Sequence, residues 1–212
     1  MSVKIVDTLG TNELKIDASH GASRASIRPD EALTWISVGA TSGLLTGVAA
    51  GGPVFSLRNI SSNVLAIRRV SVGFITTTAF TTAQGLGFNL FFARSFSASD
   101  TGGTAITLTG SQNKVRTSLA TPTSLDCRIS STAALTAGTR TLDTVALGVA
   151  GGASTGVGTA LPPVTLLQHD VGDYPIVLAQ NEGIVIANSL AMGAAGVINL
   201  YVNIEFAEMT SF

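Results

Sequence analysis

The stretch QHDVGDY holds the side chains of this sequence that are best suited to bind a metal, because His169, Asp170 and Asp173 fall within five positions of one another. Imidazole nitrogens and carboxylate oxygens are both common ligands of divalent cations. The spacing, however, matches neither an EF-hand calcium loop nor a zinc motif, and Asp is frequent in solvated turns. The pattern favours a solvated turn with no metal, and it leaves a metal site on these three side chains as the open alternative.

Cys127 carries the only thiol, so the chain cannot form an internal disulfide. A nucleophilic cysteine needs a base, and the two histidines, His20 and His169, are both distant from it in sequence. The segment LDCRIS is typical of a strand, in which a lone cysteine is usually a small buried side chain. Serine is abundant, but no G-x-S-x-G nucleophile elbow occurs. These features predict that neither Cys127 nor a Ser/His/Asp triad is catalytic.

Carboxylates for glycoside hydrolysis would have to come from Glu182, Glu205 and Glu208 or from scattered Asp. Solvation explains Glu205, which we expect on the outer face of the last strand, and Glu208, which is near the chain end. Asn59 begins a glycosylation pattern that we attribute to chance. The candidates for a stacking platform are Trp35, Tyr174 and Tyr201, which form no series. We therefore expect no enzyme, no cofactor and no metal.

The chain is sparsely charged, at 12% of residues against roughly 25% in an ordinary soluble domain. No run of about 18 apolar residues suggests a membrane span, and Asp7 and Glu13 lie where a signal peptide needs an apolar stretch. We therefore expect a soluble protein without a membrane partner. A surface with so little charge is prone to association. The sequence thus favours self-association that covers the surface, and the alternative is a Ser/Thr/Gly-rich surface that stays soluble without charge.

The distribution of charge is uneven, although the net charge is only −1 and argues against nucleic acid as the main partner. Residues 32–140 carry a net charge of +6, and residues 141–212 carry −6 without any Lys or Arg. Opposite blocks can match across a subunit contact, or they can pair inside one folded unit. Both possibilities stay open at this point.

Residues 1–31 differ in composition from the rest, since they hold 9 of the 25 charged residues. VKIVD and ELKID alternate weakly and are separated by the turn signal LGTN. We expect residues 1–31 to form an N-terminal arm that pairs along a sheet edge or reaches a neighbour. The alternative is an ordinary first hairpin of the main domain, which otherwise spans residues 32–212.

From residue 32 onward the pattern predicts strand after strand, and no convincing amphipathic helix is found. Alternation slips at Arg68–Arg69, which predicts a β-bulge, and Phe88, Leu90, Phe92 and Phe96 are expected on one face. Two hairpins are expected, TAITLT with KVRTS and LDCRIS with RTLDTVAL, and GVAGGASTGVG is expected to be a flexible loop. The other predicted strands are LTWISVG, VFSLRNI, VLAIRRVSVGFITT, GLGFNLFFARSF, PPVTLL, YPIVL and EGIVIANSL.

The closing segment GVINLYVNIEFAEM shows the clearest alternation. Ile198, Leu200, Val202, Ile204 and Phe206 point one way, and the residues between them are mostly polar. Alternation of this length is typical of a half-buried antiparallel strand. AMGAAG, which precedes it, is expected to be a hairpin between the last two strands. Eight or more strands with regular turn signals predict an all-β antiparallel sandwich or barrel.

Several stretches resemble the virion structural proteins of tailed bacteriophages. They are FSLRN, RRVSVGF, LFFARSFSASDTGGTAITLTGSQNKVRTS, RISSTAALTAGTRTLD and NEGIVIANSLAMGAAGVINLYVNIEFAE, which together cover roughly residues 53–208. The ending is also similar to the last two strands of jelly-roll head decoration (cement) proteins and of tumour-necrosis-factor-like trimers. The resemblance implies a jelly roll, a homotrimer, and a role in binding the capsid lattice, through the major capsid protein or another virion protein. No family residues can be transferred, because such proteins act through surfaces.

Three functions are compatible with this sequence. The first is a head decoration protein of a virion assembled in the host cytoplasm, which clamps capsid subunits from outside. The second is a tail, collar or fibre component, including a host-binding module. The third, from another class, is a jelly-roll carbohydrate-binding or carbohydrate-active protein, which the scarcity of His, carboxylate and aromatic clusters disfavours. The mixed-charge arm at 1–31 favours the first.

Overall fold

A computed structural model of the chain describes residues 33–108, 114–115, 118–122, 125–170 and 175–210. Within these ranges all the regular secondary structure consists of β-strands. In chain order they are β1 (Thr34–Thr41), β2 (Pro53–Asn59), β3 (Val64–Thr78), β4 (Gln84–Arg94), β5 (Thr104–Ala105), β6 (Leu125–Ile129), β7 (Thr141–Leu142), β8 (Gly148–Ser154), β9 (Ala160–Gln168), β10 (Ile176–Leu178), β11 (Gly183–Asn188) and β12 (Val197–Met209).

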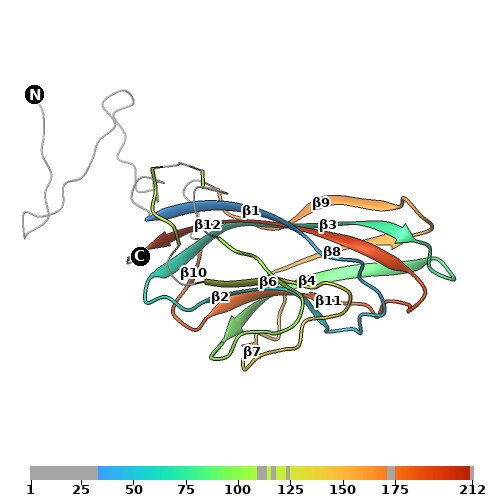
Figure 1. Cartoon of the computed structure of the whole chain (residues 1–212), viewed down its shortest axis with the longest axis horizontal. Helices are drawn as coiled ribbons and strands as arrows, with labels where there is room; N and C mark the ends of the chain where they lie inside the picture. Colours follow the sequence, from blue (N-terminus) through green and yellow to red (C-terminus); the bar gives the residue numbers. More distant parts are fainter. Residues whose placement is uncertain (1–32, 109–113, 116–117, 123–124, 171–174, 211–212) are drawn as a thin grey trace, which may run out of the picture.

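The strands form two antiparallel sheets that pack face to face (Figure 1). The first sheet has the order β1-β12-β3, and both β9 and β10 pair with the far edge of β3. The second sheet has the order β5-β6-β2-β11-β4, and both β7 and β8 pair with the far edge of β4. The predicted all-β antiparallel sandwich is therefore confirmed.

The connectivity of the eight longer strands is that of a jelly roll. Strands β1, β3, β9 and β12 belong to the first sheet, and β2, β4, β8 and β11 belong to the second. The chain crosses from one sheet to the other at nearly every connection, which interleaves two Greek keys. The four short strands β5, β6, β7 and β10 extend the edges of this frame. The pairs β1–β12 and β2–β11 bring the two ends of the sequence together.

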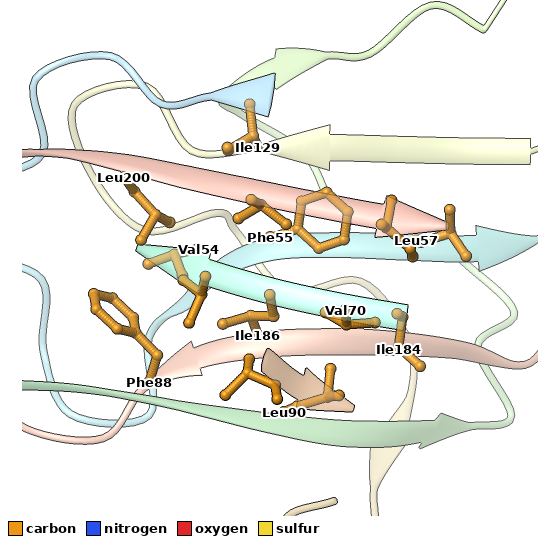
Figure 2. Close-up of a cluster of buried hydrophobic side chains, with 14 of the residues drawn as sticks. Val54, Phe55, Leu57, Val70, Phe88, Leu90, Ile129, Ile184, Ile186 and Leu200 are labelled. Atoms are coloured by element: carbon orange, nitrogen blue, oxygen red, sulfur yellow. The ribbon is translucent and has the colours of Figure 1, made fainter. Parts of the chain in front are cut away.

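The core lies between the two sheets, where apolar side chains from both inner faces meet. The five alternating residues predicted on β12 are at most 2% exposed, which confirms the predicted face. Figure 2 shows Leu200 of this strand facing Val54 and Phe88 of the second sheet. Fully burying such side chains contributes roughly 1.5–3 kcal/mol each, so the periodicity of the long strands accounts for most of the fold.

The predicted bulge at Arg68–Arg69 is present. Glu205 of β12 pairs with Arg69, whereas the next residue pairs with Ile67, so Arg68 has no partner on β12. The Arg68 guanidinium instead lies 5.6 Å from the centre of the Trp35 ring, a distance at which a cation is attracted by the ring. The bulge thus lets one long strand keep its apolar face buried on both sides of the slip.

Phe96 was expected on the same face as Phe88, and this expectation is wrong. Ser95 has a positive φ of 49°, which turns the chain just after β4 ends. Phe96 then folds onto the outer face of the second sheet, where it packs against Ala93 and Val185. The prediction failed because it extended strand periodicity past the end of the strand.

Both predicted hairpins are wrong where the structure describes them. The strand that begins at Thr104 pairs with β6, and Lys114 bridges to Ile36 of β1, while the connecting GSQN lies outside the described residues. LDCRIS forms β6, but it pairs with β2, whereas β7 pairs with β4 on the opposite side of the sheet. Turn signals suggested pairing between neighbours in sequence, but the jelly roll pairs segments that are far apart.

Two glycine-rich segments also differ from expectation. GVAGGASTGVG is not a loop over most of its length, because it contains β8, which pairs with β4 from Gly148 to Ser154. A side chain at Gly148 would collide with the backbone of Leu166, so the small residue allows the two sheets to approach each other here. AMGAAG is not a hairpin, since β11 and β12 belong to different sheets and the segment crosses between them. The predicted arm, 1–31, lies outside the described residues.

Candidate interaction surface

Cys127 lies on the inner face of β6 and is 2% exposed. Burial raises the pKa of its thiol, and the neighbouring Asp126 carboxylate raises it further. A neutral, inaccessible thiol cannot act as a nucleophile at neutral pH. The residue is part of the hydrophobic core, as its strand context suggested.

His169 and Asp170 follow directly after β9. The backbone N–H of His169 donates to the Arg68 carbonyl at 2.9 Å, and Asp170 accepts a hydrogen bond of 2.9 Å from the side chain of Gln168. Asp173, His20 and Tyr174 lie outside the described residues. Among the residues that are described, no three His, Cys, Asp or Glu side chains gather as metal ligands would.

The three glutamates proposed as candidate carboxylates are held by separate partners. Glu205 accepts a hydrogen bond of 2.6 Å from Arg69 on the outer face of the first sheet. Glu182 accepts from Arg94 at 2.9 Å at the end of the second sheet. Glu208 is buried and accepts from the amide of Asn63 at 2.8 Å. The arrangement therefore does not provide the facing carboxylates that glycoside hydrolysis requires.

Asn59 and two of the aromatic candidates have structural environments. The Asn59 amide is buried and donates to the carbonyls of Asn63 at 2.7 Å and Leu178 at 3.1 Å, so it is not accessible to a glycan. Trp35 is buried beneath Arg68. Tyr201 is partly exposed on the outer face of β12. A single exposed ring gives no series on which bases or sugars could stack.

The most distinctive surface is one end of the sandwich, where four connections lie together. They join β1 to β2 (42–52), β3 to β4 (79–83), β8 to β9 (155–159) and β11 to β12 (189–196). None of them contains a charged residue or a histidine, and the absence extends into the strands on either side, over residues 32–57, 70–93, 144–168 and 183–204. We call these four connections the uncharged cap. In Figure 1 the cap lies at the end towards which the arrow of β3 points, opposite the C-terminus.

The opposite half carries the charged residues that the structure describes, and the described chain begins and ends there, because Thr34 pairs with Glu208. Several of these charges pair between the basic and acidic sequence blocks, as in Arg69–Glu205, Arg94–Glu182 and Arg94–Asp143. These pairs support the alternative that the blocks neutralise each other inside one folded unit. The described charged residues are Arg58, Arg68, Arg69, Arg94, Lys114, Arg128, Arg140, Asp100, Asp126, Asp143, Asp170, Glu182, Glu205 and Glu208.

A buried ion pair fixes the loops that cross the outer face of the second sheet. Asp100 and Arg140 form a salt bridge with almost fully buried side chains, and Asp100 also accepts a hydrogen bond of 2.9 Å from the backbone N–H of Gly138. Burial lowers the pKa of Arg140 to about 10, so the guanidinium keeps its charge at neutral pH. The Arg140 guanidinium lies 5.0 Å from the centre of the Phe96 ring. The pair thus has a structural role.

The uncharged cap is an ordered unit, because its loops are joined by hydrogen bonds. Asn188, which is buried, donates to the carbonyls of Val48 at 3.0 Å and of Leu190. These bonds tie the β1–β2 connection to the β11–β12 connection. Thr46 adds a second link through a hydrogen bond of 2.8 Å to the Ala194 carbonyl.

The other two connections are held to the same unit. The Gln84 side chain accepts from the backbone N–H of Gly193 at 3.0 Å, and a side chain at Gly196 would collide with the Phe80 ring, so β11–β12 packs closely on β3–β4. The β8–β9 connection is joined to the β3–β4 connection across the sandwich. Thr76, near the end of β3, and Ser154, at the end of β8, share a hydrogen bond of 2.8 Å between their hydroxyls. These contacts join all four connections into one packed unit.

Three apolar side chains project from the cap: Leu44 is 54% exposed, Leu190 is 50% exposed and Val157 is 69% exposed. A surface without charges avoids the large cost of desolvating ions, and its hydroxyl groups can be buried where a partner supplies hydrogen bonds. Preorganisation lowers the entropic cost of binding further. The arrangement is suited to contact with an uncharged protein surface.

No protein-family model, characterised protein or solved structure matches this chain. Within the described residues, no helix has the length and apolar character needed to cross a membrane. Fold and surface therefore define the class: the chain is a jelly-roll β-sandwich with an uncharged cap at one end, and the charged residues that the structure describes lie in the other half.

The cap was not predicted from the sequence, although part of its signal was present. The four uncharged stretches can be read from the sequence, but only the jelly-roll topology shows that each one spans a connection at the same end. The role of Asn188 in joining the loops could not be predicted, because in the sequence this residue only interrupts an apolar run.

Proposed function

We propose that the protein is a structural protein of a tailed-bacteriophage virion, and specifically a head decoration (cement) protein that binds the capsid lattice from outside. The observation that carries the proposal is the two-ended distribution of charge. An uncharged cap lies at one end, and the described charged residues lie in the other half, where the start of β1 pairs with the end of β12. Such a molecule acts through its surfaces. The resemblance of its sequence to phage virion proteins supplies the biological setting.

The charged half, with the arm that precedes it, is the end that attaches to the lattice in this proposal. Residues 1–31 carry nine charged residues and precede β1 in sequence, and β1 begins at this end. A contact rich in both signs of charge fixes orientation and register, because mismatched like charges are strongly unfavourable. Each attached copy adds buried interface between capsid subunits and so opposes the pressure of packaged DNA. Copies of the protein associate with one another, with a homotrimer as the expected state.

The second candidate is a tail, collar or fibre component, including a host-binding module. The observation in its favour is the cap itself, which lies at the end opposite the start of β1 and exposes Leu44, Val157 and Leu190. In a fibre, the arm end would join the virion and the cap would meet the host surface.

Copy number in the virion separates the two candidates. Stained gels of purified particles, calibrated against the major capsid protein, should show hundreds of copies for a decoration protein and a few to tens for a tail component. Binding to particles stripped of the native protein then tests the orientation. A chain beginning at Asp30 should fail to bind, whereas Leu190→Glu on the cap should bind at full occupancy. The opposite result would show that the cap attaches to the lattice.

A further inference from the structure

The segment 145–149 is the most exposed apolar part of the second sheet. Val145 is 75% exposed, Leu147 is 38% exposed and Val149 is 67% exposed. The backbone N–H of Leu147 donates to the Leu90 carbonyl at 2.7 Å, and Val149 pairs with Asn89. The segment is therefore held against β4 by backbone hydrogen bonds, and its apolar side chains remain uncovered within the described chain.

The position of this segment makes its exposure unusual. It leads into β8, whose one strand partner among the described residues is β4, so within this part of the chain it forms an edge of the sheet. Proteins usually protect such edges with charged side chains, proline or a covering loop, because open apolar edges associate. Residues 144–161 contain no charged residue and no proline. An apolar edge without such protection is prone to associate with another surface.

We infer that segment 145–149 is the contact surface between neighbouring copies of this chain, an inference that rests on the self-association included in the proposed function. Charge limits the occupant, because a charged partner group would be desolvated here without a counter-charge. A second copy meets this requirement, since the adjoining outer face of β4 and β8 is also uncharged. The outward positions of this face that are not buried include Gly85, Asn89, Phe91, Gly151 and Ala153.

The location of the arm gives a second reason for a lateral contact between copies. Thirty-two residues precede Leu33, and they join the sandwich at its charged end. If all arms are to meet one lattice, the copies must be related by a rotation axis that runs along the length of the sandwich. A closed ring of this kind, which is the usual form of a homo-oligomer, uses the sides of each subunit and leaves both ends free. Strand β8 runs along such a side (Figure 1).

The test compares two valines with nearly the same exposure in the full-length protein. Val149→Glu changes the proposed contact, and Val157→Glu, on a residue 69% exposed, places the same charge on the cap. Light scattering after size exclusion should show that Val149→Glu raises the dissociation constant of the oligomer about 100-fold or more, because the charge would be buried without a partner. Val157→Glu should leave the oligomer unchanged. Leu147→Ser adds no charge and should also raise the dissociation constant of the oligomer. It replaces Val149→Glu in the comparison if that variant fails to fold.

Each outcome of this comparison decides a different point. A native protein that is a 21.5 kDa monomer at all accessible concentrations, and isolated in the virion, would refute self-association itself. An oligomeric native protein whose size neither Val149→Glu nor Leu147→Ser alters would refute the contact surface and leave self-association standing. Dissociation by Val157→Glu alone would place the contact on the cap instead.

Discussion

Asn188→Ala tests whether the cap is preorganised by its buried amide. Asn188 is at the end of β11, and its Nδ2 donates to the carbonyls of Val48 and Leu190. Truncation to alanine removes both bonds without changing charge. The Val48 carbonyl still accepts a hydrogen bond from the backbone N–H of Met192 at 2.8 Å. The substitution therefore leaves mainly the Leu190 carbonyl without its partner, and it removes the side-chain link between the two connections.

The expected cost follows from this inventory. Each hydrogen bond contributes about 0.5–1.5 kcal/mol to the free energy of unfolding, so two bonds contribute about 1–3 kcal/mol. The cavity left by the amide adds to this cost. The Oδ1 atom of Asn188 is buried without a hydrogen-bond partner among the described residues, so its removal offsets part of the loss. A net destabilisation of about 2 kcal/mol corresponds to a decrease in Tm of about 4–8 °C for a domain of this size.

Thermal unfolding and amide hydrogen exchange measure the two parts of this effect. Asn188→Ala should lower Tm by the stated amount and speed exchange in residues 42–52 and 189–196 more than in β3. The matched control is Asn203→Ala, on the outer face of β12, whose Oδ1 is also buried without a hydrogen-bond partner among the described residues; it should lower neither Tm nor the protection of the cap. Equal Tm values for the two variants, or uniform acceleration of exchange, would show that the amide does not order the cap.

Three further predictions follow from burial and domain organisation. Ile204→Asp should abolish soluble expression, because it places an unpaired carboxylate in the core, whereas Tyr201→Asp on the outer face of the same strand should be tolerated; equal yields would mean that the face is wrongly assigned. Cys127 should react with a thiol reagent only after denaturation, which absorbance of the released chromophore would follow. A chain beginning at Asp30 should stay soluble and oligomeric; precipitation would show that residues 1–31 belong to the fold.

Most of the long strands could be predicted because their two faces differ. On β12, large apolar side chains alternate with Asn199, Tyr201, Asn203 and Glu205, so the sequence indicates both the strand and its buried face. The bulge at Arg68–Arg69 was visible for the same reason, since one extra residue in a strand shifts a strong alternation by one position. In these elements local sequence and tertiary packing agree.

Strand β8 could not be predicted, because Gly148, Gly151 and Gly152 offer no contrast in size or polarity between its faces. It is a strand because β4 provides a complete row of backbone partners. The failed hairpins have a related cause. Turn signals show where a strand ends, but they do not show which sheet the next strand joins, and that choice depends on the whole core.

The charge pattern is informative because folding does not require it. A sandwich needs apolar residues at inward positions only, and the charged half of this protein carries Arg58, Arg69 and Arg128 at outward positions of its strands. The same outward positions in the other half, and four complete connections, contain no charge at all. Neither the core nor the turns account for this difference, and uncharged surfaces reduce solubility. The uncharged half is therefore suited to contact between protein surfaces, such as the proposed contact between copies, whereas the charged half is the end that attaches to the lattice in the proposed function.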